Sequence, residues 1–537
     1  MARFSLGRNL EPPSFHLHPW PPMTNSATAA RIASLILLAC SAGLSSAQSI
    51  LSEEEVQSAA KRTYPEYFKL LSMPADAAHM QDIQRNVDWL EKAFASRGFR
   101  TRQLANNGRP LLFAEFGPAR KSRKTILVYM HLDAQPAPPA GWHTDPWTPT
   151  LRKRDGDGAW QTISSDLLAT GPVDPEWRVF ARAASDDKGP IMMFLAAIDA
   201  LKGKHIDPAV NVKVLLDSEE EKGSPSLHTV MEAHKDILRS DGIVVYDGGR
   251  ASTEKPSINF GNRGSIQLNL TVFGTRTDQH SGLYGNIAPN AALRLARLVA
   301  GMKDEQGKVI IPGFYEGIHI SDADQQAMKA HVPAAGVLEK RLGVAGLDSV
   351  APNVIEALQY PSLDVLWIGS GVVGSSGVNS IPAVATASFN VRTVPETPPE
   401  RVFGLLKDYV ASHGYHVVQG EAPTEEERAA FPRMAKLTMM AYPSTQVGFR
   451  EPMDSPFSRW AIAGVRTATQ REPDLYRMGG STLPMGGAVT VLKTPYLVVP
   501  LINADSNQHG ANENLRLGNY MEGIRSIASM LTTPWKQ

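Results

Sequence analysis

Apolar residues recur along the chain with two different spacings, and these spacings predict where helices and strands lie. Between residues 54 and 100 the spacing is helical: Ile83, Val87, Leu90 and Phe94 fall on one face, and Gly98 marks a stop. From there to about residue 250, short apolar runs alternate with helical segments. This alternation is typical of an α/β sheet whose strands are mostly parallel.

The middle of the chain has a different order of elements. From Gly264 onward the pattern predicts a strand, a helix, two strands, a helix and a strand. This βαββαβ order is that of a ferredoxin-like domain. An irregular segment at about 303–360 interrupts it, and the α/β pattern resumes with a helix near 455–469 and the strand PYLVVPLI. We therefore expect one domain inserted into another, with segments at 1–47, 48–260, 261–448 (the insertion) and 449–537.

Composition narrows the classes of protein to consider. The chain has 537 residues, 42% of them hydrophobic, which is enough for two or three packed domains. Its 54 basic and 54 acidic residues cancel, so the charge balance points to no nucleic acid and no anionic membrane surface. We expect a small-molecule partner. Cys40 is the only cysteine, so no intramolecular disulfide can form.

The N-terminal segment has the features of an export signal. Arg31 precedes the apolar run IASLILLAC and a small-residue stretch, which predicts a secretory signal peptide cleaved before Gln48. The run is shorter than the roughly 20 residues that a membrane-spanning helix needs. We expect a periplasmic or secreted protein. Two alternatives stay open: a buried helix in the mature fold, or a lipoprotein anchored at Cys40.

Five polar motifs each follow a predicted apolar run. They supply chemistry-bearing side chains at widely separated positions, namely His131 and Asp133, Asp186 and Asp187, the glutamates 219–221, Asp247, and His509. The carboxyl ends of the strands in a parallel sheet open onto one crevice, so we expect these motifs to converge there.

Converging carboxylates repel one another and resist burial unless a cation neutralises them. With two histidines nearby, a divalent transition metal fits best: zinc, with manganese or cobalt as alternatives. One ion would not neutralise so many acids, so we expect a pair. Each motif alone has an ordinary explanation, since DDKG suits a helix start, Asp247 a turn, and a glutamate run a solvated face. Only the set indicates a metal centre.

Ten short motifs occur along the chain in the order HLDAQP, ARAASDDKG, SEEEKGS, VYDG, GNRGS, DQHSGLYGN, NSIPA, VRTVP, GGSTLP and QHGANE. In sequence and order they resemble the motifs of the M20 family of metallopeptidases, in the branch with carnosinase-like dipeptidases. The resemblance runs from about residue 54 to the end. It implies an α/β zinc-peptidase catalytic domain with a mostly parallel sheet, interrupted by an inserted ferredoxin-like (βαββαβ) lid/dimerisation domain.

The resemblance also implies a role for each metal-site residue. His131 and Asp247 would bind one zinc ion, Glu221 and His509 the other, and Asp186 would bridge the two.

Other roles follow from the same resemblance. Asp133 would orient His131, and Glu220 would be the general base that takes a proton from the metal-activated water and returns it to the leaving nitrogen. His280 would stabilise the oxyanion in the partner subunit's active site, which implies a homodimer through the inserted domain. Three further residues match substrate-binding positions: Asn379, Arg392 and Ser481. An arginine suits a free carboxylate; from the residues alone, His280 also fits a turn and Arg392 an exposed strand.

Two departures from the family pattern stand near Asp186. The family usually has glycine where this chain has Ala181 and Ala183. If those positions need a positive φ, alanine costs roughly 1 kcal/mol or more at each, or the loop shifts. The segment preceding this loop, about 154–180, is also longer than expected.

We interpret the chain as a two-zinc peptidase that hydrolyses dipeptides or short peptides with a free C-terminal carboxylate. One alternative keeps the site but takes an N-acyl amino acid, which makes the enzyme a deacylase or amidase. A remote alternative is a non-catalytic binding protein. Loss of Glu220 or of a metal ligand would favour that alternative, and none is lost.

Overall fold

The computed structural model describes residues 49–251, 253–371, 379–440 and 446–535. The expected signal peptide and Cys40 lie outside these residues. Within the described ranges, no helix combines the length and the apolar character needed to cross a membrane.

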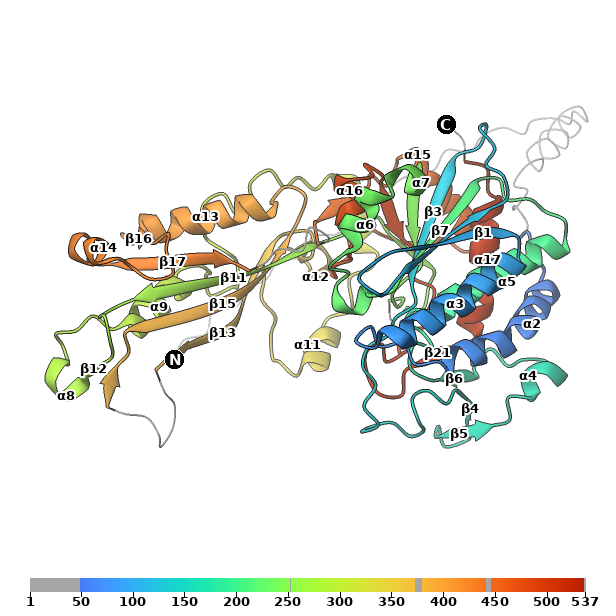
Figure 1. Cartoon of the computed structure of the whole chain (residues 1–537), viewed down its shortest axis with the longest axis horizontal. Helices are drawn as coiled ribbons and strands as arrows, with labels where there is room; N and C mark the ends of the chain where they lie inside the picture. Colours follow the sequence, from blue (N-terminus) through green and yellow to red (C-terminus); the bar gives the residue numbers. More distant parts are fainter. Residues whose placement is uncertain (1–48, 252, 372–378, 441–445, 536–537) are drawn as a thin grey trace, which may run out of the picture. The chain divides into compact units, whose positions relative to one another are not determined.

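The larger of the two main sheets has eight strands, of which β1, β3 and β7 are labelled in Figure 1. Its strand order is β1 (Phe99–Leu104), β2 (Leu111–Phe116), β7 (Asn211–Asp217), β3 (Thr125–His131), β8 (Gly242–Val245), β20 (Tyr496–Val498), β9 (Ser257–Asn259) and β19 (Asp474–Tyr476). The four central strands β7, β3, β8 and β20 are parallel. Strands β2, β9 and β19 run in the opposite direction. The predicted, mostly parallel α/β sheet is confirmed in its centre.

Helices cover both faces of this sheet, which explains why its central strands are apolar throughout. Along β3, Val128 belongs to one buried cluster and its neighbour Tyr129 to another, because successive side chains point to opposite faces. One face packs against α2 (Glu53–Leu71), α3 (Met80–Ser96), α5 (Lys188–Gly203), α15 (Pro456–Thr469) and α17 (Leu517–Thr532). The other packs against α6 (Leu227–Ala233), α7 (Lys235–Leu238) and α16 (Gly486–Thr490).

The inserted segment forms a second sheet of five strands. Their order is β13 (Ser362–Ser370), β15 (Val384–Thr393), β11 (Gly264–Phe273), β17 (Met434–Met439) and β16 (His416–Val417). Helices α9 (Ala291–Ala300) and α13 (Pro399–Ser412) share one apolar cluster with this sheet. Along the chain these elements follow in the order β11, α9, β13, β15, α13 and β17. This is the predicted βαββαβ order, so the ferredoxin-like arrangement is confirmed. Strand β16 is an addition that pairs in parallel with β17.

Smaller elements fill the remaining segments. The irregular stretch near 303–360 contains α10 (Asp322–Lys329), α11 (Val337–Leu342) and α12 (Val354–Ala357). The long segment near 154–180 belongs to a four-stranded sheet with the order β21 (Asn514–Arg516), β6 (Arg178–Phe180), β4 (Thr150–Arg154) and β5 (Trp160–Ile163), followed along the chain by α4 (Leu167–Thr170). Two further strand pairs lie outside these sheets: β10 (Gly261–Asn262) with β18 (Phe449–Arg450), and β12 (Gln279–His280) with β14 (Ser380–Ile381). Two short helices, α8 (Ser281–Tyr284) and α14 (Glu425–Ala430), belong to the inserted segment.

Candidate metal centre

Four of the five predicted metal ligands come from the carboxyl ends of the central parallel strands. His131 is the last residue of β3, Glu221 follows β7, Asp247 follows β8, and His509 lies in the loop after β20. These strands are neighbours in one sheet, so their ends share one edge.

Asp186 arrives by a different route. Its loop runs from β6 to the start of α5, and β6 belongs to the four-stranded sheet. The prediction that all five motifs follow strands of a single sheet is therefore wrong for this residue. The short run RVF was too brief to show which sheet it joins.

The five side chains lie together in two groups. One group is His131, Asp186 and Asp247, and the other is Asp186, Glu221 and His509; within each, the possible ligand atoms are within 4.8 Å of one another. Asp186 belongs to both. Its Oδ1 is 2.9 Å from Nε2 of His131, and its Oδ2 is 3.1 Å from Nε2 of His509. One carboxylate thus presents an oxygen to each group, which is what a bridging ligand requires.

The two ligand groups contain three carboxyl groups and two histidines close together, so the carboxylates repel one another unless a cation is bound. Burial, together with the charge of Asp186, raises the pKa of Asp247 to about 6 and that of Glu221 to about 7. Burial alone would also raise the pKa of Asp186, but hydrogen bonds from the two histidines outweigh it and lower that pKa. The hydrogen bond to Asp186 raises the pKa of His509 to about 9.

This donor set fits divalent transition metals. Imidazole nitrogens and carboxylate oxygens in mixed groups are typical ligands of zinc, and two divalent ions would match the crowded acidic side chains. The chemistry of the residues present therefore agrees with a two-metal site.

Asp133 supports both sides of the centre. Its Oδ1 accepts a hydrogen bond from the backbone N–H of Glu220 at 3.0 Å, and its Oδ2 accepts one from that of Glu221 at 3.1 Å. The Nδ1 atom of His131 lies 3.4 Å from Oδ1 of Asp133 and 3.2 Å from its carbonyl oxygen. Nδ1 is therefore engaged on this side, and Nε2 is left to face Asp186.

The run of three glutamates separates into three environments. Oε1 of Glu219 accepts a hydrogen bond from the N–H of Ser226, and Glu219 belongs to neither ligand group. Glu221 belongs to the second group. Glu220 lies between them, and burial, aided by the charges of Asp247 and Glu221, raises its pKa well above the usual range. A carboxyl with a raised pKa is suited to accepting a proton.

Two of the predicted substrate residues lie at one contact between the inserted segment and the loop 479–482. Nη1 of Arg392 donates a hydrogen bond to Oγ1 of Thr482 at 2.6 Å. The hydroxyl of Ser481 accepts one from Nδ2 of Asn262 at 3.1 Å. Arg263 donates to the carbonyl of Gly480 from the same side.

The other two predicted substrate residues, His280 and Asn379, are neighbours elsewhere on the inserted segment. His280 pairs with Ser380 in the β12–β14 ladder, and the N–H of Ser281 donates to the carbonyl of Asn379. Both side chains are exposed. In the part of the chain that the structure describes, no hydrogen bond or ion pair joins them to the metal-ligand groups.

Ala181 and Ala183, which stand where the family usually has glycine, have different backbone conformations. Ala183 has φ +62°, the left-handed region that favours glycine, whereas Ala181 has no positive φ. The expected conformation therefore occurs at Ala183 only, and the loop still delivers Asp186 to both ligand groups.

Glu513 is a residue of the site that the sequence analysis missed. It is buried and accepts hydrogen bonds from the loop that carries Asp186. Its position could have indicated a role in the site, because Glu513 is the last residue of the motif QHGANE, which also contains His509, and directly precedes the buried strand β21.

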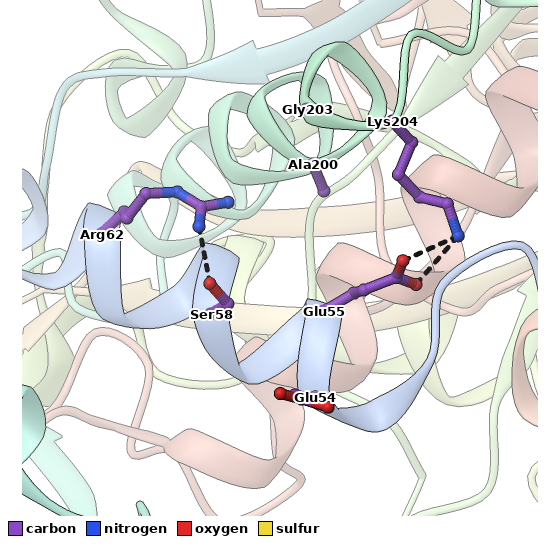
Figure 2. Close-up of a pocket in the computed structure, with 7 residues that line it drawn as sticks. All are labelled: Glu54, Glu55, Ser58, Arg62, Ala200, Gly203 and Lys204. Atoms are coloured by element: carbon purple, nitrogen blue, oxygen red, sulfur yellow. Dashed lines mark hydrogen bonds and ion pairs between the residues drawn. The ribbon is translucent and has the colours of Figure 1, made fainter.

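A pocket between α2 and α5 is separate from this centre (Figure 2). It is lined by Glu54, Glu55, Ser58, Arg62, Ala200, Gly203 and Lys204. Its charged groups bind one another: Glu55 pairs with Lys204 at 2.8 Å, and Arg62 donates to Ser58 at 2.6 Å. It shares no residue with the ligand groups, so we do not assign the chemistry to it.

Comparison with known proteins agrees with this geometry. Residues 260–418 match the peptidase dimerisation domain of the M20 peptidases. The chain is 28% identical to the Cys-Gly metallodipeptidase dug1 of Schizosaccharomyces pombe over 78% of this chain and 81% of that protein. It is 27% identical to the human Beta-Ala-His dipeptidase over 78% and 76%. Its fold is similar to the crystal structure of an M20 family metallo-carboxypeptidase from Sulfolobus solfataricus, with TM-score 0.68, 25% identity and coverage of 88% and 99%.

A parallel sheet with paired metal-ligand groups at one edge, carrying an inserted ferredoxin-like domain, defines the class as a metal-dependent hydrolase of peptide bonds. The matched dimerisation domain and the relatives make the assignment more specific. The chain carries an M20 peptidase dimerisation domain, and over 78% of its length it is similar to two dipeptidases.

Proposed function

We propose that this peptidase hydrolyses dipeptides or short peptides with a free C-terminal carboxylate, and that it does so with two zinc ions. The observation that carries the proposal is the sharing of Asp186 between the two ligand groups. The named activities of the relatives, a Cys-Gly metallodipeptidase and a Beta-Ala-His dipeptidase, support dipeptides as the substrate class.

The ligands of each ion follow from the two groups. His131 and Asp247 would hold one ion, Glu221 and His509 the other, and Asp186 both. When bound, such a pair lowers the pKa of a water molecule and polarises the scissile carbonyl. Mixed imidazole and carboxylate donors favour zinc over the harder cations, with manganese and cobalt as alternatives to be compared.

Glu220 is the proposed general base. Its backbone N–H is held by Asp133, which fixes the turn on which its carboxylate stands. It takes the proton of the attacking water and then gives it to the nitrogen of the departing amine, which leaves as a neutral group. The carboxyl has a raised pKa because it is buried, and this makes both transfers feasible near neutral pH.

Arg392 is the proposed binder of the substrate's C-terminal carboxylate. Its guanidinium makes no ion pair among the described residues and donates only a hydrogen bond to Thr482. A planar guanidinium can hold a carboxylate through two parallel hydrogen bonds. Ser481, next to Thr482, would supply a hydroxyl beside it.

We also propose that the protein is a homodimer in which His280, with Asn379, completes the partner's site. The exposure of His280 and its separation from the metal ligands of its own chain support this. So does β13, an edge strand that exposes Val365, Leu366, Trp367 and Ile368. An apolar edge strand is a ready surface for pairing with another chain. Light scattering tests the assembly, and a fully active monomer would exclude this role of His280.

Export is the proposed destination, supported by the signal-like residues 31–47. N-terminal sequencing of protein recovered from cell fractions tests it. A start at Gln48 in the exported fraction supports cleavage, a lipidated Cys40 supports a membrane anchor, and an intact N-terminus on internal protein would contradict both.

A substrate screen tests the activity. Metal-loaded protein is offered dipeptides, the same dipeptides with C-terminal amides, and N-acyl amino acids, and amine release is measured. We expect dipeptides to be cleaved in a chelator-sensitive, zinc-restored reaction, and the amides to be poor substrates. Selective cleavage of N-acyl amino acids would make the enzyme a deacylase, and inactivity towards every substrate would refute the proposed function.

A further inference from the structure

Glu513 lies at the centre of the hydrogen bonds that hold the Asp186 loop. Its side chain is only 1% exposed. Oε1 accepts three hydrogen bonds, from the N–H and hydroxyl of Ser185 at 2.8 Å each and from the N–H of Asp186 at 3.0 Å. Oε2 accepts two, from the N–H of Ala183 and from Nη1 of Arg182, both at 2.9 Å.

The pairing of two short strands places Glu513 there. Strand β21 begins at Asn514 and pairs with β6, with Asn514 opposite Phe180. The N–H of Ala181 continues this ladder by donating to the carbonyl of Glu513 at 3.2 Å. The carboxylate therefore stands beside the loop at the point where the loop leaves β6.

The loop needs such a support because its backbone is unfavourable at one point. Ala183 has φ +62°, and a side chain resists this conformation unless its surroundings enforce it. The hydrogen bond from its N–H to Glu513 is one enforcing contact. The other is packing, since Ala183 is buried against Ala75 and Ala134.

Arg182 extends the support to the second histidine. Its Nη1 forms the ion pair with Glu513, and both side chains are almost fully buried. Its Nη2 lies 3.4 Å from the carbonyl oxygen of His509. The pair therefore contacts the main chain of two predicted metal ligands, Asp186 and His509.

We propose that Glu513 is a positioning residue for the bridging carboxylate. It fixes the main chain at Asp186 so that the two carboxylate oxygens face the two ligand groups, and through Arg182 it ties this loop to the His509 segment. The inference rests on the proposed metal-binding role of Asp186. Groups behind metal ligands set the geometry of those ligands, and their loss typically costs about 10- to 100-fold in metal affinity.

Glu513→Gln is the direct test. A glutamine amide has only one oxygen to accept hydrogen bonds. In either orientation its NH₂ group therefore faces at least two groups that donate hydrogen bonds to the carboxylate in wild type, and those hydrogen bonds are lost. The Zn²⁺ affinity of folded protein is measured by competition with a chromophoric chelator. We expect it to fall by about 10- to 100-fold for at least one of the two ions.

Glu522→Gln is the matched control. Glu522 pairs at 2.7 Å with Arg250, whose side chain is 3% exposed, and neither belongs to the ligand groups. This variant should lower the unfolding midpoint and leave the Zn²⁺ affinity unchanged. An equal loss of Zn²⁺ affinity in Glu522→Gln would overturn the proposal, because the effect would then be one of general stability.

A rescue experiment separates positioning from simple loss of charge. Adding Ala183→Gly to Glu513→Gln removes the side chain that resists the positive φ, and we expect about fivefold of the Zn²⁺ affinity to return. If Glu513→Gln does not fold, Glu513→Asp is measured in its place: it keeps the charge but shortens the side chain, and its Zn²⁺ affinity should fall below that of wild type. Wild-type affinity in whichever Glu513 variant folds would overturn the proposal.

These measurements need no substrate, so they are independent of the peptidase activity. A protein with Glu513-dependent zinc affinity that hydrolyses no peptide would refute the proposed function and leave this inference standing.

Discussion

Removal of the metal ions should make the stability of the protein depend on pH in a specific direction. Without cations, the folded protein holds Asp247 with its pKa raised to about 6 and Glu221 with its pKa raised to about 7, from ordinary values of 3.8 and 4.5. The folded state then binds protons that the unfolded state has already released. Stability from these groups is fully present at low pH and is lost as the pH rises through 6 and 7.

The size of the effect follows from those values. Between pH 6 and pH 8 the linkage relation gives a loss of about 1.4 kcal/mol from Glu221 and about 0.4 kcal/mol from Asp247, together about 2 kcal/mol. His509, whose pKa is raised to about 9, changes stability in the same direction. Asp186, whose pKa is lowered, acts only at more acidic pH.

Thermal unfolding of chelator-treated and zinc-loaded protein at pH 6, 7 and 8 is the assay. For the unit Gln48–Gln537, an unfolding entropy typical of its size converts 2 kcal/mol into about 2 °C. We expect the midpoint difference between loaded and metal-free protein to grow by at least this amount from pH 6 to pH 8. Taking the difference cancels groups outside the site. Glu221→Gln should remove about 1.4 kcal/mol of the trend, and a difference that is constant or shrinks with rising pH would refute the reasoning.

Three further predictions concern single side chains. Glu220→Gln should lower kcat by about 10²- to 10⁴-fold while elemental analysis still finds two ions per chain, and undiminished turnover would exclude the general-base role. Arg392→Ala should raise KM for dipeptides by about 10- to 100-fold, because charge-assisted hydrogen bonds to the substrate are lost, and it should leave the weak cleavage of the C-terminal amides unchanged. Lys188 is buried, its Nζ donates to the carbonyls of Leu70 and Met73, and burial lowers its pKa to about 7. The unfolded state keeps this proton up to higher pH, so the stability of wild type relative to Lys188→Met should rise between pH 7 and pH 9. Denaturant midpoints of the two proteins measure this difference in stability. A difference that falls with rising pH would contradict the burial argument.

The sequence predicts well where a local pattern determines the structure. The helical face with Ile83, Val87 and Phe94 is buried in α3, and the apolar runs before His131 and Asp247 form β3 and β8. The βαββαβ order of the inserted domain follows from the same kind of pattern, because β11, α9, β15, α13 and β17 each bury an apolar face.

The sequence predicts poorly where a long-range contact decides. No local pattern shows that β6 joins β21 rather than the main sheet, since both are three residues long. The same pairing brings Glu513 to Asp186, across more than three hundred residues of chain. The positive φ of Ala183 also depends on that contact and not on its own propensity, which opposes it.

The positions of the ligands along the chain mean that the ribosome completes the two ligand groups at different times. His131, Asp186 and Asp247 all precede the inserted domain, so the ribosome makes the first group complete before the ferredoxin-like sheet begins. The second group waits for His509, which is made only after that sheet has ended. Glu513, which holds the shared Asp186, is later still. The carboxylate common to both groups is therefore synthesised early, but the side chain that holds its loop is synthesised only after the inserted domain is complete.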